Sequence, residues 1–208
     1  RPELKHALEM LSASGRVEGE VCDVRSEDQV RMMLEEAVRV FGGIDILVNN
    51  AGVTRDNLAL RMKDEEWEAV IKVNLEAAFR LARAALKPMM MKQRFGRIIS
   101  VTSVVGVTGI PGQANYAAAK MGLVGLSSVT AIEGAKYNIK SNVITPIART
   151  RLTEGLMGAT GEMFAPEYIA PMVAYLVSEA CEHTHEIFNV GAGRYSRIFV
   201  ASAPGWNA

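Results

Sequence analysis

The sequence predicts an α/β fold, in which a parallel sheet has helices packed on both faces. Segments with strand character alternate with segments of helical periodicity along most of the chain, and the connections between them are short. This alternation is typical of repeated βα units. The run from Ile44 to Val48 is short and mostly apolar, which suits a strand buried on both faces of such a sheet.

The N-terminal part contains two helical patterns and two strand patterns. Residues 3–13 carry apolar side chains at helical spacing, and a glycine ends the pattern. Val17–Val24 is expected to form a short strand, and residues 27–41 place apolar side chains on one side of a second helix. Gly42-Gly43 then separates this helix from the strand at 44–48.

The later elements continue the alternation. A long helical pattern begins at Asp64, a suitable N-cap residue, and runs to Met91. The remaining elements follow in the order strand 97–103, helix 111–136, strand 139–145, helix 167–179 and strand 186–190. The sequence has no internal repeat, and we expect residues 1–208 to form one domain.

Composition disfavours several kinds of partner. The 23 basic residues balance the 23 acidic ones, which argues against nucleic acid. No apolar run is long enough to span a membrane, and no signal peptide follows Arg1. Cys22 and Cys181 lie too far apart in sequence for a CxxC motif or a disulfide framework, which favours the cytoplasm. The neighbouring His183 and His185 do not form a metal-binding pattern, so we expect no metal site.

Candidate functional residues follow the predicted strands, because sheets of this kind bind ligands at the carboxyl ends of their strands. The tetrapeptide Asn49-Asn50-Ala51-Gly52 follows one strand, and it would leave backbone donors exposed beside room for a flat ligand. A polar turn containing a glycine would have the same sequence. Ser103 follows the next strand, where it would be either a functional hydroxyl or an ordinary turn former.

Two further candidates lie on predicted helices. Tyr116 and Lys120 are four residues apart, so they share one helix face. An ammonium beside a phenol lowers the pKa of the phenol, and such a phenol can transfer protons near neutral pH. An ordinary surface pair is the alternative. Asn74 interrupts an apolar stripe, where a buried amide needs partners and could either bend the helix or hold a water.

These motifs occur together in one order: NNAG, Asn74, Ser103 and then, after 12 intervening residues, Tyr116-x-x-x-Lys120. The combination resembles the short-chain dehydrogenase/reductase family over nearly the whole chain. The resemblance implies a Rossmann-like, doubly wound sheet in three α/β/α layers. The segments VNNAGVTRDNLALRMKDEEW and GQANYAAAKMGL look like bacterial 3-oxoacyl-[acyl-carrier-protein] reductases. SNVITPIARTRLT and EIFNVGAGR look more like the 3-hydroxyacyl-CoA dehydrogenase domains of multifunctional β-oxidation enzymes.

The resemblance also implies catalytic roles. Tyr116 would be the general acid for ketone reduction and the base for alcohol oxidation. Lys120 would lower the pKa of that tyrosine and hold the nicotinamide ribose. Ser103 would donate to the substrate oxygen, and Asn74 would anchor a water that connects Lys120 to solvent.

The implied cofactor is NADP or NAD, with a preference for NADP. The residues that would contact it, besides Tyr116 and Lys120, are Asp23 and Val24 at the adenine, Asn50, Ala51 and Gly52 at the ribose, and Pro146, Ile147 and Thr150 at the nicotinamide. Ile147 departs from the family, which usually has a glycine there. The residues that discriminate NAD from NADP belong to a segment that this sequence does not contain.

That segment includes the glycine loop TGxxxGxG, which cradles the pyrophosphate in the family. Arg1 aligns after the second strand of the family, so the first βαβ portion is missing from the sequence. In the family these strands lie between the equivalents of Val17–Val24 and Ile44–Val48. We therefore expect the sequence to be incomplete.

The function expected from the resemblance is interconversion of 3-oxoacyl and 3-hydroxyacyl thioesters carried on acyl carrier protein or coenzyme A. A 3-hydroxyacyl-CoA dehydrogenase, or a dehydrogenase of another secondary alcohol such as a steroid, is the alternative within the class. A non-catalytic fragment that cannot bind cofactor is the alternative outside it. The small residues Ala117–Ala119, Gly122 and Gly125 allow close helix packing, and the resemblance implies that this helix forms an interface in a homodimer or homotetramer.

Overall fold

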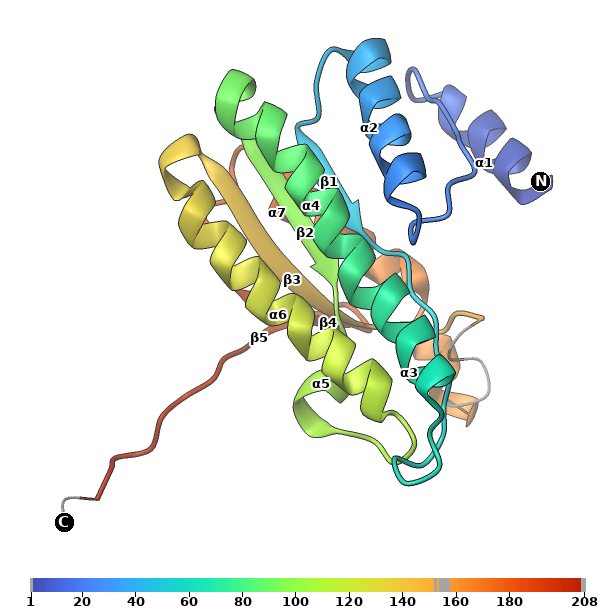
Figure 1. Cartoon of the computed structure of the whole chain (residues 1–208), viewed down its shortest axis with the longest axis vertical. Helices are drawn as coiled ribbons and strands as arrows, with labels where there is room; N and C mark the ends of the chain where they lie inside the picture. The colour runs from blue at the N-terminus through green and yellow to red at the C-terminus, as the bar shows by residue number, and fades with distance from the viewer. Residues whose placement is uncertain (1, 152, 154–157, 207–208) are drawn as a thin grey trace.

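The computed structural model describes residues 2–151, 153 and 158–206 (Figure 1). Within these residues, five strands form one sheet in the order β1-β2-β3-β4-β5. The strands are β1 (Ile46–Asn49), β2 (Gly96–Val101), β3 (Ile139–Ile147), β4 (Ile187–Gly191) and β5 (Arg194–Ile198). The first four run parallel to their neighbours, and β5 pairs antiparallel with β4.

Helices cover both faces of the sheet. The α-helices of the described residues are α1 (Pro2–Ser12), α2 (Glu27–Phe41), α3 (Asp64–Ile71), α4 (Ala77–Pro88), α5 (Val105–Thr108), α6 (Ala114–Gly134) and α7 (Ala170–Val177), of which α1 lies beyond α2 and does not cover the sheet (Figure 1). The helices α2, α4 and α6 lie on one face, and α7 lies on the other (Figure 1). This arrangement confirms the predicted doubly wound α/β/α architecture.

The core consists of two apolar clusters separated by the sheet. Ile98 of β2 belongs to the cluster beneath α2 and α4, together with Leu47 and Leu81. The next residue, Ile99, belongs to the cluster beneath α7, together with Leu176. Because successive side chains of a strand point to opposite faces, β2 is buried on both sides. This double burial explains the apolar character of its sequence.

The predicted strand Val17–Val24 is wrong. All of these residues are described, and none of them belongs to a strand. A strand is defined by hydrogen bonds to a neighbouring strand, and β1 is at the edge of the sheet with no strand on its outer side among the described residues. Ile46 and Val48 of β1 are 46% and 42% exposed, although both are aliphatic. Among the described residues, β1 is therefore an edge strand with an exposed aliphatic surface.

The predicted helix from Asp64 to Met91 is divided into four parts. The helices α3 and α4 are separated by a π-helical turn at Lys72–Glu76, and a second π-helical turn, Met89–Gln93, follows Pro88. Pro88 lacks an N–H and so cannot bond to the carbonyl of Ala84 in the last turn of α4. The first interruption contains Asn74, whose amide has partners outside the helix.

The hairpin of β4 and β5 extends beyond the last predicted strand. Ala192 and Gly193 connect the two strands, and both have positive φ, 48° and 72°. Two successive residues of this kind form a tight hairpin turn whose twist matches that of the strands. Glycine accepts this conformation readily but alanine does so rarely, so the pair Ala-Gly is a weak turn signal. The polar sequence of Arg194–Ile198 added no strand signal of its own.

Candidate active site

The carboxyl ends of β1, β2 and β3 form one edge of the sheet. Asn49, the last residue of β1, is paired with Ser100 of β2, and its Nδ2 donates to Ser100 Oγ across 3.3 Å. Thr102 and Ser103 follow the end of β2 directly. The NNAG tetrapeptide and Ser103 therefore begin at neighbouring strand ends, as the motif analysis predicts.

Lys120 reaches this edge from α6. Its side chain is buried, and Nζ donates to the Val101 carbonyl across 2.7 Å. Thr102 Oγ1 donates to the main-chain carbonyl of Lys120 across 2.5 Å. The end of β2 thus holds the lysine by both its main chain and its ammonium.

Gly52 provides the close approach between the NNAG loop and this lysine. A Cβ atom placed on Gly52 would lie 3.5 Å from Lys120 Nζ and 3.4 Å from Asn74 Oδ1. A larger side chain would displace one of these polar groups. The glycine of the tetrapeptide, Asn74 and Lys120 consequently meet at one place.

The amide of Asn74 is used by the loop after β1. Its Oδ1 accepts the N–H of Val53 across 2.8 Å, and its Nδ2 donates to the carbonyl of Val53 across 2.9 Å. These bonds tie the NNAG loop to the π-helical turn Lys72–Glu76. Both polar atoms of the Asn74 amide are therefore already engaged by Val53.

Tyr116 lies beside Ser103 and Lys120. Lys120 Nζ is 5.4 Å from the centroid of the Tyr116 ring. Burial raises the pKa of Tyr116 above 10, the hydrogen bond with Ser103 lowers this pKa, and the Asp56 carboxylate raises it. Burial also lowers the pKa of Lys120 to about 8. In this structure the pKa of the phenol is shifted upward, because burial outweighs the contribution of Ser103. The lowering expected from Lys120 is therefore not seen, and Lys120 is not among the causes of the shift.

Ser103 is fixed at the start of a short helix. Its Oγ accepts the N–H of Val105 across 3.2 Å, while α5 begins at that residue. Its hydroxyl is near enough to the phenol of Tyr116 to lower the pKa of that phenol. Ser103 and Tyr116 can therefore contact the same substrate oxygen.

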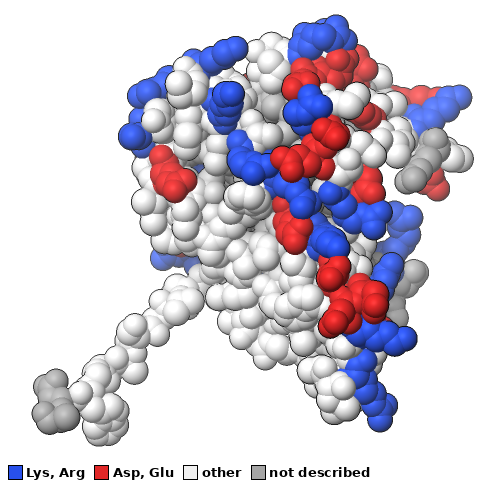
Figure 2. Space-filling view, viewed as in Figure 1, with Lys and Arg blue, Asp and Glu red and all other residues white. Residues whose placement is uncertain are grey.

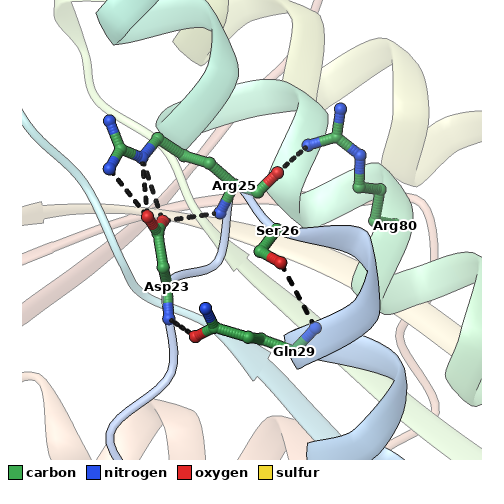
Figure 3. Close-up of polar contacts among 5 residues, drawn as sticks. All are labelled: Asp23, Arg25, Ser26, Gln29 and Arg80. Carbon is green, nitrogen blue, oxygen red and sulfur yellow. Dashed lines mark hydrogen bonds and ion pairs between the residues drawn. The ribbon is translucent and has the colours of Figure 1, made fainter.

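The predicted adenine-side residue Asp23 lies in a turn before α2, not at the end of a strand. Figure 3 shows its carboxylate held by Arg25, whose Nε and terminal nitrogen donate across 2.9 and 2.7 Å. These bonds lower the pKa of Asp23 to about 2. Ser26 caps α2 by accepting the N–H of Gln29, and Arg80 of α4 donates to the Arg25 carbonyl.

A cavity of about 190 Å³ lies next to the NNAG segment. Val24, Asn50 and Ala51 line it, so the structure brings three of the predicted cofactor-binding residues together. Asn49 also lines it, and within the described part of the chain its buried Oδ1 has no hydrogen-bond partner. This oxygen is suited to accept a hydrogen bond from a ligand in the cavity. The cavity is smaller than the roughly 300 Å³ at the low end of ligand pockets, so it matches one portion of a dinucleotide.

Pro146 and Ile147 end β3 at the same edge, and both are half-buried. Thr150 follows them, and its N–H donates to Thr153 Oγ1 across 2.9 Å. Gly191 of β4 packs so closely that a Cβ atom there would lie 2.9 Å from the Ile147 carbonyl. The segment predicted to face the nicotinamide therefore begins at the same edge of the sheet as the other candidate residues. Residues 152 and 154–157 of the connection that follows lie outside the described residues.

The sequence profile described as "short chain dehydrogenase" matches residues 2–157. The chain belongs to the short chain dehydrogenase family. This membership confirms the resemblance inferred from the motifs. The family does not by itself distinguish NAD from NADP.

Similar proteins include enzymes of two kinds. The chain is 43% identical over 192 residues to the peroxisomal hydratase-dehydrogenase-epimerase of Neurospora crassa, covering 91% of this chain and 21% of that enzyme. It is 41% identical over 203 residues to the 3-oxoacyl-[acyl-carrier-protein] reductase of Salmonella typhimurium, covering 92% of this chain and 82% of that enzyme. The chain thus spans about a fifth of the length of the fungal relative.

A solved structure of a short chain dehydrogenase from Mycobacterium avium has the same fold. Its TM-score is 0.86 with 36% identity, and the match covers 98% of this chain and 72% of that one. Among the residues described here, no helix is long and apolar enough to cross a membrane. The described His, Cys, Asp and Glu residues form no group of three that could hold a metal ion.

Proposed function

We propose that residues 1–208 carry the catalytic residues of one dinucleotide-binding domain, which in the full protein interconverts 3-oxoacyl and 3-hydroxyacyl thioesters. The observation that carries this proposal is the convergence of Ser103, Tyr116 and Lys120 at one edge of the sheet. The identity to a 3-oxoacyl-[acyl-carrier-protein] reductase, 41% over 203 residues, supports the substrate class.

In the proposed mechanism, the Ser103 hydroxyl donates to the substrate carbonyl oxygen and stabilises the negative charge that develops there. The Tyr116 phenol gives its proton to the same oxygen during reduction and takes it back during oxidation. When bound, the nicotinamide cofactor supplies or accepts the hydride. Asn74 keeps the NNAG loop against the site through its two bonds to Val53.

Lys120 has two proposed roles that follow from its position. Its ammonium lies near the Tyr116 ring, and its positive charge there favours the phenolate form of the tyrosine. The same ammonium lies near Gly52, so its N–H groups can donate to a cofactor bound beside the NNAG loop. Burial lowers the pKa of Lys120 to about 8, so near neutral pH the amine is poised to replace a proton lost from the tyrosine.

The proposed cofactor is NADP or NAD, with NADP preferred. The residues that would hold it are Asp23, Val24, Asn50, Ala51, Gly52, Tyr116, Lys120, Pro146, Ile147 and Thr150. The unpartnered Asn49 oxygen and the space left by the missing Cβ of Gly52 support a ligand at this edge. No glycine loop for the pyrophosphate is present among residues 1–208.

The group that carries the acyl thioester, either acyl carrier protein or coenzyme A, distinguishes two versions of the proposed activity. Acyl carrier protein is favoured by the Salmonella relative, and the cytoplasm is the corresponding location. Coenzyme A is favoured by the identity to the Neurospora enzyme and by the C-terminal segment EIFNVGAGR. We regard 3-hydroxyacyl-CoA dehydrogenase as the second candidate activity for this reason.

A homodimer or homotetramer is the proposed assembly. Lys120 and Glu133 are the charged residues of α6, and Lys120 is buried. Figure 2 shows a broad uncharged surface over this helix. Val129 and Ile132 are 53% and 68% exposed on α6, which is costly unless another surface covers them.

The experiment that tests the activity is a spectrophotometric assay of the full protein with acetoacetyl thioesters. NADPH and NADH are each combined with the acyl-carrier and the coenzyme A substrate. Turnover with at least one combination is expected, and the ratio of kcat/KM values assigns cofactor and carrier. Absence of turnover with all four would reject the proposed function.

A further inference from the structure

The buried amide of Asn115 lies where three segments around the site meet. Asn115 precedes Tyr116 in the first turn of α6, and its side chain is fully buried. Its Nδ2 donates to the main-chain carbonyls of Arg55 and Glu66 across 2.9 and 3.1 Å. Its Oδ1 accepts the N–H of Tyr116 across 2.7 Å. One side chain therefore joins the loop after β1, the helix α3 and the start of α6.

These bonds replace the usual cap at the start of a helix. The first N–H groups of a helix need acceptors from outside the helical ladder. Gln113 at the N-cap makes no capping bond with its side chain, which donates instead to Asp56 at the surface. Asn115 supplies the acceptor for Tyr116 from within the first turn. Loss of this amide would remove the bonds to the Arg55 and Glu66 carbonyls and the acceptor of the Tyr116 N–H, which together hold the first turn in place.

We infer that Asn115 is a positioning residue for Tyr116. This inference rests on the proposed function, in which Tyr116 transfers the proton. Tyr116 and Ser103 come from different elements, and their contact depends on how the first turn of α6 sits against the loop after β1. Asn115 fixes that relationship through Arg55 and Glu66. A proton donor that moves by about 1 Å can lose on the order of 100-fold in rate.

The groups around the Tyr116 phenol determine whether its pKa should rise or fall when Asn115 is removed. The Ser103 hydroxyl lowers the pKa of Tyr116, while the Asp56 carboxylate and burial raise it. Lys120 lies on the same helix, one turn away, with Nζ 5.4 Å from the ring centroid. Displacement of the first turn weakens the contact with Ser103 first, because Lys120 moves with the helix. The pKa of Tyr116 should therefore rise when Asn115 is removed.

The test compares Asn115→Ala with Asn142→Ala in the full protein. Asn142 is a matched control, because its buried amide also bridges main-chain groups, at His183 and Glu186. The primary measurement is the ultraviolet titration of the Tyr116 phenol. It is isolated by subtracting the titration of the same variant carrying Tyr116→Phe. This measurement needs no substrate, so it remains informative if the protein shows no turnover.

Asn115→Ala should raise the midpoint of this titration by about one pH unit, whereas Asn142→Ala should leave it unchanged. In a turnover assay, Asn115→Ala should also lower kcat by about tenfold or more, with the KM for the thioester within about twofold. If Asn115→Ala does not fold, Asn115→Ser takes its place with the same expected direction. A wild-type midpoint in the Asn115 variant, or an equal shift in Asn142→Ala, would overturn the inference. Absence of turnover in the wild-type protein would reject the proposed function instead.

Discussion

The ammonium of Lys120 donates a 2.7 Å hydrogen bond to the carbonyl of Val101, at the end of the strand that leads to Ser103. The lysine side chain is 3% exposed, and this burial lowers its pKa from 10.5 to about 8. A cation in this position loses most of its hydration and is compensated by few polar groups. Burial of the Lys120 ammonium therefore lowers the stability of the folded protein, at a position where the proposed chemistry needs a group that carries a proton.

This cost predicts how stability depends on pH. The folded-state pKa of Lys120 is below that of the unfolded chain, so the unfolded chain binds more protons between about pH 8 and 10.5. The free energy of unfolding of the wild-type protein should rise through this window relative to Lys120→Met. The full difference is about 3 kcal/mol. Urea unfolding of both proteins at several pH values measures it.

Lys87 of α4 is exposed and offers a matched control for this prediction. Lys87→Met should follow the wild-type dependence on pH. Identical pH dependence in wild type and Lys120→Met would show that Lys120 is not buried as a cation.

Tyr116→Phe removes the proposed proton donor but keeps the aromatic ring. Reduction of an acetoacetyl thioester should slow by about 100-fold or more, because transfer through a positioned acid contributes at least this much. Binding of the cofactor, measured by fluorescence titration, should change little. Near wild-type turnover in this variant would remove Tyr116 from the mechanism.

The pH profile of alcohol oxidation reports on the pair of Tyr116 and Lys120. The rate should rise with pH as the phenol loses its proton, because the phenolate is the base in this direction. Lys120→Ala removes a positive charge next to the phenol, which favours the neutral form, so the midpoint should move to higher pH. Steady-state rates between pH 6 and 11 provide the measurement. A profile that does not move, in a variant that still binds cofactor, would show that Lys120 does not influence the tyrosine.

The position of the site could be predicted from the sequence because it depends on two local rules. Residues that follow parallel strands share one edge of the sheet, which brings the NNAG segment next to Ser103. Residues four apart share one face of a helix, which pairs Tyr116 with Lys120. Neither rule requires knowledge of long-range contacts.

The parts that could not be predicted depend on partners distant in sequence. The strand character of Val17–Val24 was not sufficient, because a strand forms only against another strand. The amides of Asn74 and Asn115 are used by the main chains of Val53, Arg55 and Glu66, and no local pattern identifies these partners. A buried asparagine in a helix is nevertheless a useful signal, because its amide must be satisfied.

Gly52 predicts a graded response to side-chain size. In Gly52→Ala the new Cβ lies 3.4 Å from Asn74 Oδ1 and 3.5 Å from Lys120 Nζ, which is ordinary contact. Gly52→Val adds two further methyl groups, which must displace the Asn74 amide, the Lys120 ammonium or the NNAG loop. We expect activity within about threefold of wild type for alanine and a loss of about 100-fold for valine. Assays of both variants at matched thermal stability test this, and an active valine variant would argue against a close approach of Gly52 to Lys120.

Residues 1–208 expressed alone should bind dinucleotide weakly or not at all. Most of the pyrophosphate partners in this family are N–H groups of a glycine loop, and the sequence of this chain does not contain that loop. On the adenine side, the Asp23 carboxylate is engaged by Arg25, and the segment Val17–Val24 has no strand to hold it against β1. The small cavity beside Asn50 and Ala51 can contact only one portion of the cofactor. Calorimetric titration of the purified chain with NADH and NADPH measures the affinity. Micromolar binding would mean that the remaining residues supply a phosphate site of their own, and would contradict the role assigned to the missing glycine loop.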